Sequence, residues 1–214
     1  MRGRRLFAAI YEPLFAAPEN AGLREMRSKL LAQASGRTLE VGAGTGLDLP
    51  HYTAAVSELV LTEPDPHMTK RLREAVDEVG PAAPTEIVEA DAEHLPFQEA
   101  SFDTVVCGLV LCTVENPEAS VSEMARVLRP GGSLLFLEHV RATEGSARAR
   151  WQDRLERPWR AFAGGCRPNR RTVEALEAST LQIESCEMRE FPPRAAALVR
   201  PLAIGVARRR APRP

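Results

Sequence analysis

The sequence lacks the features that define several whole classes of protein. No run of apolar residues reaches the length of about 18 that a membrane-spanning helix needs. The 28 basic and 29 acidic residues nearly cancel and leave a net charge of -1, whereas a protein that binds nucleic acid must neutralise many phosphates. We therefore expect no integral membrane segment and no nucleic-acid partner.

Basic residues cluster near the two ends of the chain, at Arg2, Arg4 and Arg5 and again at residues 208–210. Short basic ends are usually solvated tails, and weak peripheral contact with a membrane surface is the alternative. The apolar stretch after the first basic residues is too short and too soon interrupted for a signal peptide.

Cysteine is scarce, with four residues in all: Cys107, Cys112, Cys166 and Cys186. None are spaced as CxxC, and no set of cysteines and histidines has the spacing of a zinc site. No cluster of acidic residues argues for a magnesium site. We therefore expect reduced thiols, a cytoplasmic location and no bound metal.

What the sequence does have is a hydrophobic content of 44%, enough for a substantial core, and a regular alternation of strand and helix patterns. Strands are expected at residues 38–41, 59–62, 86–89, 102–109 and 133–137, and helices at 19–34, 66–79 and 117–128. This alternation predicts a doubly wound α/β fold of Rossmann-like type. Two further helices, 145–162 and 169–179, precede a final hairpin of strands, 181–189 and 197–207, so the mostly parallel sheet is expected to have seven strands.

The chain is expected to form one domain with three parts. Residues 1–36 would be a helical cap or lid, residues 37–140 the cofactor-binding core, and residues 141–214 the acceptor-side helices and final strands. Trp151 and Trp159 approximate one helix face, which predicts packing in the core or beneath a lid.

The strongest local motif is Leu39-Glu-Val-Gly-Ala-Gly-Thr-Gly46. A glycine-rich turn after the first strand allows a ligand to approach the backbone closely. Dinucleotide enzymes use the spacing GxGxxG and hold a pyrophosphate there, whereas this turn is GxGxG and follows Glu40. Because a carboxylate repels pyrophosphate, the motif favours a ligand that carries an ammonium and a sulfonium.

Two acidic residues at later strand ends strengthen that interpretation. Glu63 ends the second predicted strand, where a carboxylate can accept both ribose hydroxyls. Asp91 follows the third, where it can accept a hydrogen bond from an adenine amino group. A nucleotide-binding oxidoreductase or an inactive cofactor-binding module remains the alternative of another class, although the glycine spacing and Glu40 disfavour the oxidoreductase.

Several motifs together resemble the ubiquinone/menaquinone-biosynthesis-like branch of class I methyltransferases. They are the glycine motif, Ala90-Asp-Ala-Glu-His-Leu-Pro-Phe97, Phe102-Asp-Thr-Val-Val106 and Val127-Leu-Arg-Pro-Gly-Gly132. A longer similarity, over roughly residues 38–207, is to the small methyltransferase-like proteins whose animal members methylate alkyl thiols. It includes Cys107-Gly-Leu-Val-Leu-Cys-Thr-Val114, Leu137-Glu-His-Val140 and Gly165-Cys-Arg-Pro-Asn-Arg-Arg-Thr172. Those relatives carry a hydrophobic N-terminal membrane anchor, whereas this sequence has only a short amphipathic start, so the resemblance is not taken to imply an anchor here.

The resemblance implies S-adenosylmethionine as the cofactor and a small molecule as the methyl acceptor. Asp91 and the backbone of Ala92 would hold the adenine, Glu63 beside Pro64 the ribose, and the backbone near Leu109 would face the ammonium. The remaining residues would line or orient the methionine end: Glu40, Gly42, Ala43, Gly44, Gly46 and Asp48.

The acceptor is expected to be a small, largely apolar thiol, with a phenol or quinol methylated on oxygen or carbon as the alternative. The pKa of a free thiol is about 8.5. A thiol therefore depends less on a strong general base than a hydroxyl group does. If a base is used, His139 at the end of the fifth predicted strand is the first candidate and Tyr11 the second. Cys166, Asn169 and Arg170 are expected to shape the acceptor pocket together with these two residues.

Overall fold

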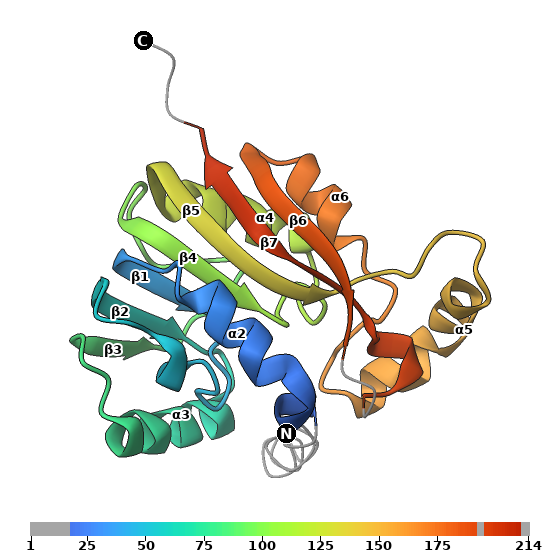
Figure 1. The fold of residues 1–214 in the computed structure, drawn as a ribbon, viewed down its shortest axis with the longest axis horizontal. Helices are drawn as coiled ribbons and strands as arrows, with labels where there is room; N and C mark the ends of the chain where they lie inside the picture. The colour runs from blue at the N-terminus through green and yellow to red at the C-terminus, as the bar shows by residue number, and fades with distance from the viewer. Residues whose placement is uncertain (1–17, 192–194, 211–214) are drawn as a thin grey trace.

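The computed structural model describes residues 18–191 and 195–210, which form a seven-stranded sheet. Helices cover both faces of this sheet (Figure 1). The strand order is β3-β2-β1-β4-β5-β7-β6. The first five strands in this order pair in parallel, whereas β7 is antiparallel to both β5 and β6. The strands are β1 (Gly36–Val41), β2 (Val56–Thr62), β3 (Thr85–Val88), β4 (Phe102–Gly108), β5 (Leu128–His139), β6 (Leu181–Glu190) and β7 (Pro201–Arg209). The predicted mostly parallel, seven-stranded Rossmann-like sheet is confirmed.

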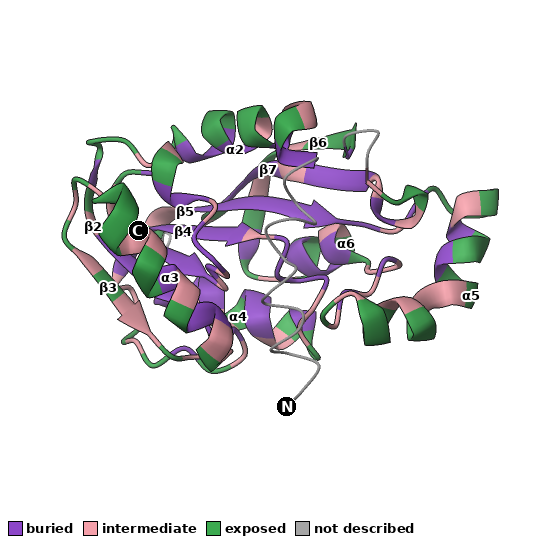
Figure 2. Ribbon diagram, turned by 90° about the horizontal axis from the view of Figure 1, so that it is seen from below, coloured by how far each residue is buried: buried purple, intermediate pink, exposed green. Residues whose placement is uncertain are grey.

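The central strands are apolar on both faces because each face is covered. Successive side chains along a strand point to opposite sides, and the two buried clusters divide β2 accordingly. Val60 belongs to one cluster, while its neighbours Leu59 and Leu61 belong to the other. Figure 2 shows these central strands as a buried layer between helices whose outer surfaces are exposed. Such two-sided burial is typical of parallel sheets.

The helices begin where the sequence supplies capping groups. The side chain of Asp65 accepts a hydrogen bond from the backbone N–H of His67 at the start of α3 (Pro66–Val79), and Asn116 caps α4 (Pro117–Val127) in the same way. An oxygen-bearing side chain at this position satisfies a helix N–H group that has no partner within the helix. The other helical segments are η1 (Glu19–Leu23), α2 (Arg24–Leu31), η2 (Leu49–His51), α5 (Ala147–Phe162), α6 (Thr172–Glu177) and η3 (Ala197–Val199).

The structure corrects four local predictions. The helix expected over residues 19–34 is interrupted at Gly22, whose φ of 131° is not helical. The helix expected over 169–179 shortens to α6, and residues 197–199 form the single turn η3 before β7 begins at Pro201. Trp151 is 53% exposed rather than buried, because positions eight apart on a helix do not share one narrow face.

The described part of the predicted lid packs on the sheet. Leu30 and Leu31 of α2 are buried in the same cluster as Leu59 and Leu135, and α2 lies across one face of the sheet in Figure 1. Tyr11 lies outside the described residues. No described helix combines the length and the apolar character that would let it cross a membrane.

The pairing of β7 with its neighbours leaves no room for a side chain at Gly205. A Cβ atom there would lie 2.0 Å from the backbone oxygen of Ser185 and 2.9 Å from the ring of Phe136. We expect Gly205→Ala to lower the free energy of unfolding by about 3 kcal/mol, the upper end of the usual overpacking range, because backbone must move to relieve the contact. Gly80→Ala is the matched control: Gly80 has open space around it and a φ of 58°, so it should cost only about 1–2 kcal/mol of left-handed strain. Equal losses in urea unfolding would contradict this ranking.

Candidate functional site

A cavity of about 760 Å³ opens at the carboxyl ends of β1, β2 and β4. It falls within the range of roughly 300–1,000 Å³ that is usual for small-molecule sites. Within the sheet, β2 and β3 lie on one side of β1, whereas β4 and β5 lie on its other side. Open α/β sheets bind ligands where the strand order reverses in this way, so the topology itself identifies this cavity as the candidate site.

The glycine turn forms one wall of the cavity, and its glycines have different surroundings. Gly42 and Gly44 line the cavity. A Cβ atom on Gly42 would lie 2.7 Å from a methyl group of Val110, and one on Gly46 would lie 2.7 Å from Leu49. The hydroxyl of Thr45, within the turn, is buried and has no hydrogen-bond partner among the described residues. Gly42 and Gly46 therefore allow close packing, while Gly44 exposes backbone to the cavity.

Glu63 lies on the cavity wall directly after β2, next to Pro64. Its carboxylate accepts hydrogen bonds from the backbone N–H groups of Gly44, at 3.0 Å, and Asp65, at 2.9 Å. The side chain is therefore oriented by the glycine turn on one side and by the start of α3 on the other. Both carboxylate oxygens thus have a fixed position at the end of β2.

Asp91 and Ala92 line the cavity beyond β3, on the side away from the glycine turn. The Asp91 carboxylate accepts a hydrogen bond from the backbone N–H of Glu93 at 2.9 Å and lies 3.3 Å from Nδ1 of His94. Leu109 closes the opposite wall after β4. Its φ of 62° is unusual for a residue with a branched side chain, and strained backbone of this kind is found preferentially at functional sites.

Glu40 and Asp48 lie behind the cavity wall in a buried polar cluster. Tyr52 donates a hydrogen bond to Glu40 at 2.8 Å, while Arg27 of α2 donates to Asp48 at 2.6 Å and to Glu19 at 2.9 Å. Burial raises the pKa of Glu40 well above its usual range, and the nearby Asp48 carboxylate adds to this effect. Of the other predicted cofactor residues, Ala43 and Gly46 also lie behind the wall and not on it.

His139 and Cys166 come together, but neither lies on the cavity wall. Nδ1 of His139 is 3.7 Å from Sγ of Cys166. Cys112 lies beside them, and the sulfur and nitrogen atoms of the three residues are within 4.8 Å of one another. A hydrogen bond from Cys112, followed by the influence of His139, lowers the pKa of the Cys166 thiol to about 5, whereas the pKa of Cys112 is raised. Sequence reasoning placed His139 and Cys166 in one pocket but did not associate Cys112 with them.

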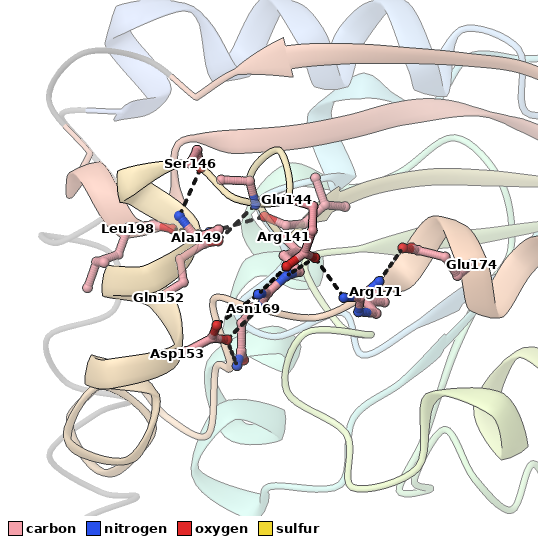
Figure 3. Close-up of polar contacts among 12 residues, drawn as sticks. Arg141, Glu144, Ser146, Ala149, Gln152, Asp153, Asn169, Arg171, Glu174 and Leu198 are labelled. Atoms are coloured by element: carbon pink, nitrogen blue, oxygen red, sulfur yellow. Dashed lines mark hydrogen bonds and ion pairs between the residues drawn. The ribbon is translucent and has the colours of Figure 1, made fainter.

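Asn169 and Arg170 hold loops in place and do not line the cavity. Asn169 donates a hydrogen bond to Asp153 of α5 at 3.0 Å, and Asp153 is also paired with Arg141 (Figure 3). Arg170 donates to the backbone oxygens of Val114 and Glu115 in the loop after β4. The two predicted acceptor residues thus position the segments that carry the cavity wall.

Sequence reasoning missed Glu138, which organises that wall. Its buried carboxylate accepts hydrogen bonds from the backbone N–H groups of Val110, at 2.8 Å, Leu111, at 2.9 Å, and Cys112, at 3.3 Å. Burial raises the pKa of Glu138 to about 7, although the amide hydrogen bonds lower it. An acidic residue that directly follows the apolar run 134–137 was the available signal.

Comparison with known proteins agrees with this geometry. Residues 39–136 match the model of the methyltransferase domain family. Human thiol S-methyltransferase TMT1B is 37% identical over 175 residues, which cover 79% of this chain and 70% of that protein. Human thiol S-methyltransferase TMT1A is 35% identical over 81% of this chain and 71% of that protein. The fold matches the solved structure of a geranyl diphosphate methyltransferase in complex with SAM, with a TM-score of 0.70 and 12% identity over 88% of this chain and 85% of that one.

The raised pKa of Glu138 predicts a pH-dependent stability. In the folded protein this carboxyl keeps its proton up to about pH 7, against a usual value of 4.5, so its contribution is complete below about pH 4.5 and is lost as the pH rises through 7. We expect the stability of the wild type to fall by about 1–3 kcal/mol relative to Glu138→Gln between pH 5 and pH 8. Urea unfolding of both proteins at pH 5, 6.5 and 8 measures the difference. A difference that stays constant or grows in favour of the wild type would show that the amide groups keep Glu138 ionised.

Proposed function

The chain belongs to the S-adenosylmethionine-dependent methyltransferase family, and from this membership we propose that it transfers the cofactor's methyl group to the sulfur of a small, largely apolar thiol. The observation that carries the acceptor class is the identity of 35–37% to two thiol S-methyltransferases over about four fifths of the chain. That similarity is longer than the 98 residues, 39–136, that match the methyltransferase domain. It therefore includes segments that lie outside the cofactor motifs.

The residues on the cavity wall support S-adenosylmethionine as the ligand. We assign Asp91 and Ala92 to the adenine, Glu63 to the ribose, and Gly44 with Leu109 to the methionine end, because all of them line the cavity. When bound, this cofactor supplies an electrophilic methyl group on a positively charged sulfur.

The polar cluster behind the wall favours a cationic group at the methionine end. Glu19, Glu40 and Asp48 are three buried carboxyl groups, whereas Arg27 is the cation that the hydrogen bonds place among them. An ammonium near this cluster would favour the ionised form of Glu40, whose pKa burial raises. We accordingly assign Glu40, Ala43, Gly46 and Asp48 to the support of that end of the cofactor.

We assign the acceptor to the part of the cavity that lies beside the end of α5. Its wall includes Val114 from the loop after β4 and Ala161, Phe162 and Gly165 from the end of α5 and the loop that follows, with the polar residues Thr113 and Glu115 on either side of Val114. This lining supports a small apolar acceptor. The work of the protein is to align the acceptor with the methyl group and to exclude water, and alignment alone can lower a barrier by about 7 kcal/mol or more.

A thiol suits this site because it ionises without a strong base. Its free pKa is about 8.5, and a positive charge a few ångström away lowers it. The alternative acceptor, a phenol or quinol, would need a base, and His139, the first candidate from the sequence, lies off the cavity wall. Methylation of a thiol therefore does not require a general base on the cavity wall.

Cofactor binding is tested by removing the carboxylate at the end of β2. We expect Glu63→Ala to weaken binding of S-adenosylhomocysteine by about 1–3 kcal/mol, because ligand hydroxyls would lose their acceptor. Glu78→Ala, on the exposed surface of α3, should leave the affinity unchanged. Calorimetry on both variants, with NADH as a competing ligand class, gives the answer. Unchanged affinity in Glu63→Ala would remove this residue from the site, and tight binding of NADH would favour the oxidoreductase alternative.

The acceptor is tested with matched small thiols and phenols. With labelled S-adenosylmethionine we expect methyl transfer to the thiol, with a rate that rises between pH 6 and 9 as the thiolate fraction increases. The phenol has a pKa of about 10, so it should react far more slowly over this range. Turnover of the phenol with none of the thiol would refute the thiol proposal and leave the methyltransferase assignment in place.

A further inference from the structure

We propose that Cys112, His139 and Cys166 form a binding site for one thiophilic divalent metal ion of the zinc class, directly behind the acceptor end of the cavity wall. The sequence predicts no metal, because these three residues lie far apart in the chain and lack the spacing of known zinc motifs. The fold brings them together. The proposal does not depend on which acceptor is methylated.

The distances between the donor atoms suit a tetrahedral ion. The two sulfurs and one imidazole nitrogen all lie within 4.8 Å of one another, and Nδ1 of His139 is 3.7 Å from Sγ of Cys166. With metal–sulfur bonds of about 2.3 Å, two thiolates on one tetrahedral zinc ion are about 3.8 Å apart. The observed group therefore needs a contraction of at most about 1 Å to reach ligand geometry.

Three separate elements supply the donors, and each is anchored by bonds that do not involve the donor atoms. Cys112, in the loop after β4, donates its N–H to Glu138 at 3.3 Å, and its oxygen accepts from Arg167 at 2.8 Å. The N–H of Cys166 bonds to Ala163 at 3.1 Å. His139 ends β5, within the sheet. A donor set held by its own backbone in this way is preorganised for an ion.

The surroundings of these three residues favour a bound dication. All three residues are buried, with apolar neighbours that include Val199 and Ala163, and the ring of Phe191 lies 5.2 Å from that of His139. Nε2 of His139 is also buried and has no hydrogen-bond partner among the described residues. Metal binding would release the protons of both thiols, and two thiolates with one divalent ion and a neutral imidazole sum to zero charge, as burial requires.

The donor set also limits which ion binds and how. Thiolate and imidazole ligands select zinc or similarly soft ions over magnesium or calcium, which prefer oxygen. Among the described residues, no fourth histidine, cysteine or carboxylate completes the group. A tetrahedral ion would therefore retain one position for water or another small ligand, as zinc sites with three protein ligands do.

An ion in this position would join segments that form the cavity wall. Thr113, next to Cys112, and Gly165, next to Cys166, both line the cavity. The same ion would attach these two loops to the end of β5 through His139. Metal binding is therefore expected to raise the melting temperature, because it favours only the folded arrangement of the three segments.

The test uses the full-length chain, reduced under anaerobic conditions and titrated with Zn²⁺ and with Co²⁺. We expect one ion per chain, a thiolate-to-cobalt charge-transfer band, tetrahedral cobalt bands, and a higher melting temperature with Zn²⁺. Cys112→Ser, Cys166→Ser and His139→Asn should each weaken Zn²⁺ binding at least about 100-fold, more than the loss of an outer-shell partner causes. Cys186→Ser is the matched control, since Cys186 lies on β6 outside the group, and it should bind like the wild type.

The readout is independent of methyl transfer, and circular dichroism of each variant separates loss of a ligand from loss of the fold. Failure of the reduced wild type to bind either ion would overturn the proposal. So would binding that survives all three ligand substitutions or that disappears in Cys186→Ser. Recovery of the purified chain with a Cys112–Cys166 disulfide, together with no Zn²⁺ binding after reduction, would replace the metal site with a redox pair.

Discussion

The position of the cavity wall depends on one buried carboxylate. Glu138, near the end of β5, accepts hydrogen bonds from three consecutive backbone N–H groups, those of Val110, Leu111 and Cys112. A chain that leaves a parallel strand and turns at once toward a helix exposes amide groups that the sheet cannot satisfy, and burying them unpaired is costly. Glu138 satisfies them from the neighbouring strand. The loop can therefore be buried and still present Leu109 and Val110 to the cavity.

The same loop connects the two parts of the molecule to which we assign function. On its outer side it forms the wall opposite Glu63, and on its inner side it carries Cys112 to within reach of His139 and Cys166. A change in its path would alter the cofactor site and the proposed metal site together. Burial raises the pKa of Glu138 to about 7, and the hydrogen bonds from the loop offset the cost of burying this carboxyl group.

The second constraint is the charge cluster that ties α2 to the glycine turn. Arg27 reaches Asp48 and Glu19 with side chains that are nearly inaccessible to solvent. Charges buried in this way require their partners, because removal of one leaves the other uncompensated. The helix before β1 is thus fastened to the base of the cofactor site. The polar character of that base is a property of these side chains and not of the fold, since Rossmann-like sheets host many chemistries.

The sequence by itself determined the sheet, its parallel core and the residues at the strand ends. These are local properties: apolar periodicity reports burial, and the glycine turn with Glu63 and Asp91 follows directly from where the strands stop. Only the tertiary structure decided which distant residues meet. It brought Cys112 to His139 and Cys166, Arg27 to Asp48, and Glu138 to the loop after β4. Contacts between such segments depend on how the helices and loops pack across the sheet, and no spacing along the chain encodes that packing.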